Sequence, residues 1–501
     1  MWYNFIIQRG ISGGIIMKRN TFRRATALAL AALMVLGTFM LTGCGKSYEH
    51  IFGDVEWMST YKDKASDPDV MIKDTYYYSD DWFSDDPSTE NKELALASMQ
   101  LVASCVSDQD DNAGAAFLKS VGFEEVGYSD FASTDPEDCN YTWAKKSLGD
   151  TTLVAVVMQS VNTDWHLRNK VWKQNFTVNG PNGETSGEHY AYATAVNKVV
   201  DDIAALAGDG NTTYWLAGQS RGGALTNVLA VRLAEKVDGA KIFAYTFEAP
   251  ATVDSDAAGS YKNIHNYICS DDIVTHMPMW GMTRYGVTHD LKKDTDDGLA
   301  DALSALGSPA ADMRARIVTD DVVARLAENL DARVPSRAEF SAERTDSWTD
   351  GDGSHEVTYS YQDALVKLMD LVFRENYEDS SLLEGLASKK GNLEGAIGDL
   401  INGVKAENSG GDPSADYWAA TKGMYAVLEE VNGGELPVSQ EDLYKVIRFA
   451  APVLITIPEG GGDADTELLT DVIGYSRELI YSHQFDTIIA RLKILAPTPD
   501  K

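Results

Sequence analysis

Basic residues are few in this chain of 501 residues, where 43 lysines and arginines stand against 76 aspartates and glutamates and give a formal net charge of -33. Such a charge repels nucleic acid and anionic lipid headgroups alike. The composition therefore argues against a nucleic-acid partner and indicates a solvated acidic surface. With 44% hydrophobic residues and no internal repeat, the chain can still bury a large core, in one elaborated domain or in two to three ordinary ones.

Long apolar runs are also scarce, and the stretch from Ala25 to Met40 is short for a membrane-spanning helix. Four basic residues precede it, namely Lys18, Arg19, Arg23 and Arg24. A basic start followed by a short apolar stretch is typical of a signal peptide, with an uncleaved anchor helix as the alternative. The residues before Met17 add nothing to such a signal, so we predict that the natural start is Met17.

The apolar stretch ends in Leu41-Thr42-Gly43-Cys44. This tetrapeptide resembles the lipobox of bacterial lipoproteins, which implies that the thiol of Cys44 is acylated and that the peptide before it is removed. Two acyl chains suffice for stable anchoring. We therefore expect residues 1–44 to be a lipoprotein signal peptide with its lipobox, and the rest of the chain to be a lipoprotein held outside the cytoplasm on the bacterial cell membrane.

Cysteine is rare, with four in the whole chain. If lipid takes Cys44, then Cys105, Cys139 and Cys269 remain. This odd number permits at most one disulfide and no zinc site of four cysteines. The stability of the fold must therefore come from packing.

One acidic turn, Asp350 to Glu356, invites comparison with a calcium loop. It fails as an EF-hand, because His355 stands where glycine is required and Tyr361 where the bidentate glutamate should be. The sequence predicts a solvated turn there, and neither a metal nor a cofactor.

Apolar runs of strand length alternate with helical periods in the first half of the chain. The strand-like runs are Leu153 to Met158, Thr213 to Ala217, Ile242 to Phe247 and Ile264 to Cys269. The helical periods are Leu94 to Val106, Ala115 to Val121, Tyr190 to Ala207 and Ala224 to Lys236. This alternation implies an α/β fold with a mainly parallel sheet. From about Asp294 to Tyr481 the pattern indicates helices, among them Tyr361 to Tyr377, as a packed second domain or a mobile lid.

The run Gly218-Gln219-Ser220-Arg221-Gly222 has the G-x-S-x-G pattern, which gains weight from its context. It lies between a predicted strand and a predicted helix, so Ser220 falls on a sharp turn that exposes its hydroxyl group. The two glycines avoid clashes across that turn. The amide of Arg221, at the helix N-terminus, can point at a developing oxyanion. Ser220 is therefore the predicted nucleophile.

A serine nucleophile needs a base that takes its proton and an acid that orients the base. In the fold that carries this turn the order is serine, acid, histidine, with the acid just past a later strand. Asp271 and Asp272 follow the strand-like run that ends at Cys269. They should lie at the carboxyl edge of the sheet, where sites are built.

At this point the chain resembles the class 3 (fungal-type) lipases, and more closely their bacterial "lipase family protein" relatives. The resemblance covers about Asp150 to Asp290, with a fainter similarity near the C-terminus. Before the G-x-S-x-G turn, two features carry the resemblance: a strand that leads to a tryptophan (Val156 to Val161, then Asp164-Trp165) and a helix start like H-x-G-F (Gly187-Glu188-His189-Tyr190). The turn itself is the third feature. After it come a stretch like T-F-x-x-P (Tyr245 to Pro250) and a stretch like N-D-I-V (Asn266 to Val274).

The resemblance implies the remaining site residues. The N-D-I-V match assigns the acid to Asp272, with Asp271 as the alternative. The family's oxyanion hole uses the residue after the nucleophile, here Arg221, and a serine or threonine of an R-G-[ST] loop, whose place is taken by Val161. The chain departs from the family here, so only a backbone amide or the hydroxyl group of Ser160 could donate. One such donor is worth about 10²-fold to 10³-fold in rate.

Eight histidines compete for the role of base. His50 is too close to the lipidated end, His355 lies in the acidic turn, and His276 follows the acid too tightly. Three others precede the acid, namely His166, His189 and His265. In fungal-type lipases a noncatalytic histidine near G-Y-x-H comes first and the catalytic one lies close to the C-terminus. His289 resembles the first and His483 the second, so His483 is the predicted base and His289 the alternative.

The sequence as a whole predicts an α/β-hydrolase with a large helical insertion between the acid and the histidine. The expected parts after the signal peptide are a core (45–293), a helical cap (294–480) and a C-terminal core segment with the base (481–501). The expected function is a lipid-anchored serine carboxylester hydrolase, a lipase or esterase, acting on an ester or lipid. The alternatives are a noncatalytic lipoprotein for ligand binding or envelope structure, motivated by the loss of R-G-[ST], and a serine peptidase.

Overall fold

The computed structural model describes residues 50–59, 61, 68, 70–105, 113–129, 137–159, 165–208, 210–313, 319–377, 382–434, 436–458, 462–475 and 478–497. The predictions for the signal peptide, Cys44, Ser160 and Val161 lie outside these residues. Cys105, Cys139 and Cys269 are buried free thiols. Packing therefore has to stabilise this part of the chain without a disulfide among these three cysteines.

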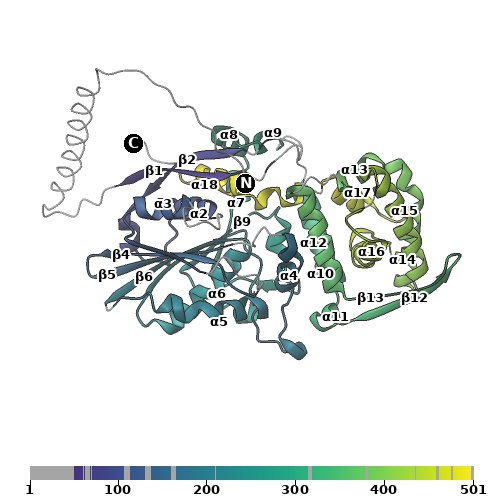
Figure 1. Ribbon diagram of the computed structural model, residues 1–501, viewed down its shortest axis with the longest axis horizontal. Helices are drawn as coiled ribbons and strands as arrows, with labels where there is room; N and C mark the ends of the chain where they lie inside the picture. The colour runs from purple at the N-terminus through teal and green to yellow at the C-terminus, as the bar shows by residue number, and fades with distance from the viewer. Residues whose placement is uncertain are drawn as a thin grey trace, which may run out of the picture. The chain divides into compact units, whose positions relative to one another are not determined.

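Within the described residues, the centre of the fold is a seven-stranded sheet in the order β11-β9-β7-β6-β5-β4-β3 (Figure 1). The strands from β11 to β5 are parallel, and β4 and β3 continue the sheet in antiparallel pairs. The register pairs Met158 with Gly218 and Gln219 with Phe247, so the carboxyl ends of β5, β6 and β7 meet at one edge. The predicted α/β fold with a mainly parallel sheet is thus confirmed. The strands are β3 (Glu125–Tyr128), β4 (Tyr141–Leu148), β5 (Thr151–Met158), β6 (Asn211–Gln219), β7 (Lys241–Phe247), β9 (Ile264–Ile268) and β11 (Val287–Asp290).

Helices cover both faces of this sheet (Figure 1). Trp215 and Ala217 of β6 belong to a core shared with α2 and α18, whereas Tyr214 and Leu216 belong to a core shared with α5 and α6. A strand covered on both faces is apolar along its whole length, which is why these runs were recognisable in the sequence. The helices around the sheet are α2 (Lys92–Ser104), α3 (Ala113–Ser120), α4 (Trp165–Asn175), α5 (Tyr190–Ala204), α6 (Arg221–Lys236), α7 (Leu291–Thr295), α8 (Leu299–Leu306), α9 (Ala310–Met313) and α18 (Phe485–Leu495).

A tyrosine-rich hairpin precedes α2. Its strands β1 (Ile51–Met58) and β2 (Met71–Tyr78) pair antiparallel. Tyr76 and Tyr78 are buried in the core that α2 and α18 share with the sheet. The hairpin therefore adds a layer that the sequence pattern did not indicate.

The second half of the chain is mainly helical, as predicted, and α12 has the predicted bounds. Its helices enclose a third apolar core among the described residues, which also takes in Ile273 and Val274 next to the sheet. The acidic turn near Asp350 is solvent-exposed, as predicted, and it joins two antiparallel strands that the sequence pattern did not indicate, in which Trp348 and Val357 are buried. The elements are α10 (Thr319–Arg333), α11 (Arg337–Ser341), β12 (Arg344–Asp350), β13 (Gly353–Tyr359), α12 (Tyr361–Tyr377), α13 (Leu382–Ser388), α14 (Glu394–Asn408), α15 (Ser414–Asn432), α16 (Gln440–Leu454) and α17 (Glu467–Gly474).

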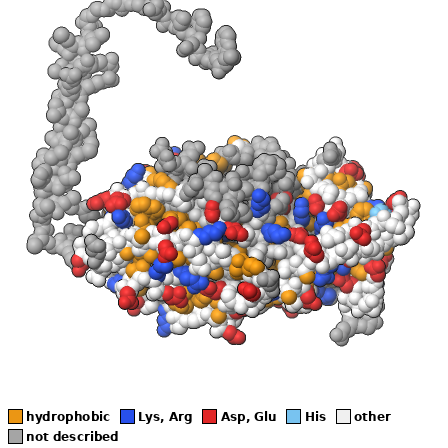
Figure 2. All heavy atoms as spheres, turned by 60° about the horizontal axis from the view of Figure 1, so that its bottom comes forward, with side chains coloured by type: hydrophobic (Ala, Val, Ile, Leu, Met, Phe, Trp, Pro, Cys, Tyr) orange, Lys and Arg blue, Asp and Glu red, His pale blue; other side chains and the backbone are white. Residues whose placement is uncertain are grey.

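The surface of the described residues is polar. Figure 2 shows one face on which acidic and basic side chains are interspersed with scattered apolar ones. None of the helices in the described part of the chain combines the length and the apolar character that crossing a membrane requires.

Candidate active site

Ser220 lies on the turn between β6 and α6. Its backbone has φ 57° and ψ -129°, a conformation that side-chain-bearing residues seldom adopt. The turn is fixed because the amide of Ser220 donates to the carbonyl of Phe247 (2.9 Å) and its carbonyl accepts from the amide of Ala224 (3.0 Å). The strain is stored where the serine hydroxyl is presented, which is typical of functional turns.

The two glycines of the motif are required by close packing. A Cβ atom at Gly218 would overlap the backbone of Gly222, and one at Gly222 would overlap the carbonyl of Met158 at the end of β5. Any larger residue at either position would push α6 away from the sheet. The steric explanation predicted from the sequence therefore holds in the structure.

The structure brings Ser220, His483 and Asp272 into one chain of hydrogen bonds. Nε2 of His483 lies 2.8 Å from Oγ of Ser220, and Nδ1 of His483 lies 2.6 Å from Oδ2 of Asp272. An ionised Asp272 can only accept, so Nδ1 carries the proton and Nε2 is left to accept the serine proton. This is the geometry that activates a serine hydroxyl.

Local contacts hold both partners of Ser220. Asp272 is fully buried, and its Oδ1 accepts a hydrogen bond from the amide of Val274 (2.9 Å) at the start of the 3-10 turn η4 (Ile273–His276). His483 is 5% exposed and ends the 3-10 turn η7 (Glu478–His483). The side-chain amide of Gln219 donates to the carbonyl of His483 (2.9 Å). Sequence reasoning missed Gln219, because its partner lies 264 residues away.

Asp486, just after the base, anchors this end of the chain. It is 1% exposed and accepts hydrogen bonds from Trp57 Nε1 (2.8 Å), Ser59 Oγ (2.6 Å) and Ser308 Oγ (2.5 Å). These donors come from the N-terminal hairpin region and from the segment between α8 and α9. They fix the start of α18 and hence the approach of His483 to the sheet.

The alternative residues have other partners. Nε2 of His289 lies 3.1 Å from Nδ1 of His265, and Nδ1 of His289 lies 3.4 Å from Glu90. The Asp271 carboxylate lies 3.5 Å from the ammonium group of Lys292 and 3.9 Å from the guanidinium group of Arg491. Neither His289 nor Asp271 joins Ser220.

The described half of the predicted oxyanion hole is the amide of Arg221, the first residue of α6. The other half was assigned to Ser160 or Val161, outside the described residues. Just before them, the amide of Gln159 donates to the carbonyl of Asn140 (2.9 Å), and its side chain donates to the carbonyl of Cys105. The end of β5 is thus tied to β4 and to the end of α2 before the chain reaches the predicted donors.

Glu248 lies behind Asp272 and was missed as a site residue. It stands in the T-F-x-x-P-like stretch, is fully buried, and has a positive φ of 44°. Burial, and then the nearby Asp272 carboxylate, raise the pKa of Glu248 well above its usual value. A buried guanidinium group, that of Arg284, is also close, and burial lowers the pKa of Arg284 to about 10. The positive φ has no sequence signature in a glutamate, so the pattern alone could not have singled it out.

Within the described part of the chain, no group of three or more histidine, cysteine, aspartate or glutamate side chains is arranged to hold a metal ion.

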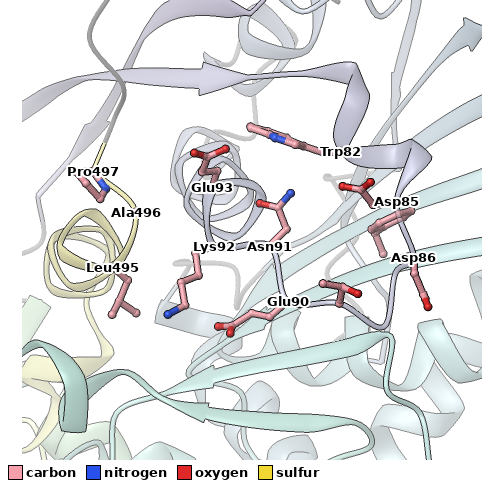
Figure 3. A pocket seen from close by; sticks show the side chains of 12 residues that line it. Trp82, Asp85, Asp86, Glu90, Asn91, Lys92, Glu93, Leu495, Ala496 and Pro497 are labelled. Atoms are coloured by element: carbon pink, nitrogen blue, oxygen red, sulfur yellow. The ribbon is translucent and has the colours of Figure 1, made fainter.

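A hollow of about 490 Å³, which is lined by both polar and apolar residues, lies at the end of the sheet opposite to Ser220. Lys241, which begins β7, donates to the carbonyls of Ser84 and Asp85 beside this hollow, so it marks the amino ends of the parallel strands. Figure 3 shows Glu90 and Lys92 from the start of α2 and Leu495 from the end of α18 around it. The hollow is therefore separate from the serine site.

Known proteins resemble the part of the chain that forms the site. Residues 156–282 match the family described as Lipase (class 3). No curated protein matches the chain. Solved structures with a similar fold include a lipase from Rhizomucor miehei in its native propeptide complex (20% identity, 37% of this chain and 61% of that chain, TM-score 0.27), a triacylglycerol lipase from Penicillium expansum (18%, 33% and 68%, TM-score 0.24) and the Lip2 lipase from Yarrowia lipolytica (16%, 39% and 77%, TM-score 0.26).

The fold and the site geometry define an α/β protein with a serine, histidine and carboxylate at the carboxyl edge of a mainly parallel sheet. Within this chain, residues 156–282 resemble the class 3 lipases. The matched segment contains Ser220 and Asp272 and ends before His483. The chain spans about 60% of the length of the Rhizomucor miehei lipase.

Proposed function

We propose that the chain is a serine carboxylester hydrolase that acts through an acyl-enzyme. The observation that carries the proposal is the hydrogen-bond chain from Ser220 through His483 to Asp272. Ser220 attacks the ester carbonyl while Nε2 of His483 takes its proton. Nε2 then returns that proton to the leaving alcohol, and water repeats the sequence to release the acid.

Asp272 and the oxyanion donors stabilise the charges that develop during the reaction. Asp272 keeps His483 in the tautomer that can accept a proton and stabilises the imidazolium that forms. The amide of Arg221, with Val161 or Ser160 as the proposed partner, stabilises the oxyanion of the tetrahedral intermediate.

The experiment that tests the proposal combines a fluorophosphonate probe with ester assays. Wild-type protein should be labelled and should hydrolyse soluble esters, and Ser220→Ala should lose both properties while keeping its circular dichroism spectrum. Folded wild-type protein that takes up no probe would identify a noncatalytic hydrolase fold. Cleavage of peptide amides without cleavage of acylglycerols would identify a peptidase.

The proposed location is the outer side of a bacterial cell membrane, with diacylglycerol on Cys44. The support is the lipobox-like Leu41-Thr42-Gly43-Cys44 after a basic and apolar segment. Cells expressing the protein can be fed an alkyne-tagged fatty acid. Tagging should appear on the wild type and disappear in Cys44→Ala, which should also move from the membrane fraction to the soluble fraction. Tagging that persists in Cys44→Ala would contradict the assignment.

A further inference from the structure

Glu248 is buried against the triad, and the mechanism above gives it no role. We propose that Glu248 is a positioning residue that, as a neutral carboxylic acid, donates a hydrogen bond to Asp272 and holds it toward His483. This inference rests on the proposed function. Its evidence is the placement of the two carboxyl groups and of the donors around them.

The two carboxyl groups differ in the strength of the donors that they receive. Oδ1 of Asp272 accepts from the amide of Val274 and Oδ2 lies 2.6 Å from Nδ1 of His483. Glu248 accepts from the amide of Cys269 through Oε2 (3.0 Å) and also hydrogen-bonds to the thiol of Cys269, which is a weak donor, while no other N–H or O–H group of the described residues donates to the buried Oε1. Donors stabilise the charged form of a carboxyl group, so the negative charge belongs on Asp272.

The carboxyl groups of Glu248 and Asp272 are near enough to each other for a side-chain hydrogen bond. Two ionised carboxylates are both acceptors, so such a bond exists only when one of them carries a proton. Since Asp272 receives the stronger donors, the amide of Val274 and the ring N–H of His483, we place the proton on Glu248. Burial and the Asp272 charge raise the pKa of Glu248 well above its usual value, which agrees with this assignment.

The charged and titratable neighbours leave no compensation for a second anion. Beside Asp272 and His483, these neighbours are Arg284 and the thiol of Cys269. Nε of Arg284 donates to the carbonyl of Ala249 (2.5 Å), and its Nη2 donates to the carbonyl of Thr275. The buried guanidinium group of Arg284 therefore balances the negative charge of Asp272. A neutral Glu248 avoids a second buried negative charge without a partner.

The backbone conformation of Glu248 supports a positioning role for its side chain. Its φ of 44° is rare for a residue with a side chain, and its amide is held by the carbonyl of Tyr267 (2.9 Å). Glycine would adopt this conformation without strain. A strained glutamate at the position indicates that its carboxyl group contributes to the site.

The test compares two substitutions of similar length. Glu248→Gln keeps a donor in place of the acid proton, and Glu248→Met removes it. We expect Glu248→Gln to retain most of the wild-type kcat. We expect Glu248→Met to lower kcat by about 10-fold to 100-fold with little change in KM, because one hydrogen bond to a charged group is lost from a residue that orients the base.

The pH profile of kcat/KM separates this proposal from an ionised Glu248. Without its neutral donor, Asp272 holds the imidazolium more strongly, so the acid limb of Glu248→Met should move to higher pH, while that of Glu248→Gln stays in place. If Glu248 were an anion, both substitutions would remove a negative charge and move the acid limb to lower pH. That shared downward shift would overturn the proposal.

Infrared spectroscopy supplies a readout that needs no activity. At pH 7 the wild type should show the carbonyl stretch of a buried protonated carboxyl group, and Glu248→Gln should lack it. A difference spectrum without that band would overturn the assignment even if the esterase is active. The band can be present in a wild type that neither reacts with the fluorophosphonate probe nor hydrolyses esters. That result would contradict the proposed function but would still support a protonated Glu248. Thermal melts of both variants show whether any loss comes from unfolding.

Discussion

The side-chain amide of Gln219 donates a hydrogen bond of 2.9 Å to the main-chain carbonyl of His483, so the residue before Ser220 also holds the backbone of His483. The two residues are both buried, and 264 positions separate them in the chain. This long-range hydrogen bond therefore helps to align His483 with Ser220.

Replacing this donor should reduce catalysis. Gln219→Met keeps the length of the side chain and loses the amide, so we expect kcat to fall about 10-fold, because a misplaced base accepts the serine proton less well. Steady-state kinetics on a soluble ester will measure this. The control is Gln100→Met, which removes another buried amide, one that donates to Asp74 (2.8 Å) away from the site. Equal kcat values for the two variants would contradict the role of Gln219.

The choice between the two candidate bases gives a second prediction. His483→Ala should lower ester turnover by at least about 10³-fold, because Ser220 loses the group that takes its proton. His289→Ala should not, since that ring contacts His265 and Glu90. Turnover under saturating ester measures both variants. The opposite ranking would move the base to His289.

Asp486 should be important for stability. Asp486→Ala leaves the donors of Trp57, Ser59 and Ser308 without their common acceptor, so we expect the free energy of unfolding to fall by about 3 kcal/mol. Asp486→Asn retains an acceptor oxygen and should lose less. Urea unfolding followed by tryptophan fluorescence will measure both. Identical midpoints for the wild type and Asp486→Ala would rule out this anchoring role.

His189 gives a pH dependence of stability. Burial lowers the pKa of His189 from 6.5 to about 3. Below pH 6.5 the unfolded chain takes up a proton that the folded protein excludes, so this contribution is complete above pH 6.5 and is lost as the pH falls toward 3. The slope is at most about 1.4 kcal/mol per pH unit.

Glutamine at position 189 tests that linkage. His189→Gln keeps a donor for the carbonyl of Asn175, which Nε2 of His189 approaches at 2.9 Å, but it cannot titrate. The free energy of unfolding should therefore fall less steeply between pH 6.5 and pH 5 in His189→Gln than in the wild type. Parallel slopes in urea unfolding would show that His189 takes up its proton in the folded state as well.

The sequence predicted what depends on local sterics and periodicity. The turn at Ser220 is set by glycines within four residues of one another, and the strands β5 to β7 are apolar throughout because helices cover both faces. These signals lie within short stretches of the chain. The strand–turn–helix around Ser220 was therefore predictable without any knowledge of the rest of the fold.

The remaining features depend on contacts between distant segments. His483 was distinguished from His289 by resemblance to a family, since the base and the serine are 263 residues apart. Gln219 ends strand β6 and Glu248 follows strand β7, and both contact segments that lie further along the chain. The β12–β13 hairpin was missed because most of its side chains are polar and only one face of it is buried. No local pattern encodes these arrangements.

The helical segment stands in the chain between Asp272 and His483, and this order affects the timing of activity. A ribosome completes Ser220 and Asp272 first, then has to make every helix from α10 to α17 before it reaches the histidine. Until then, the nascent chain displays a serine with no base beside it. Any hydrolysis at Ser220 is thereby delayed until the helical segment has been synthesised.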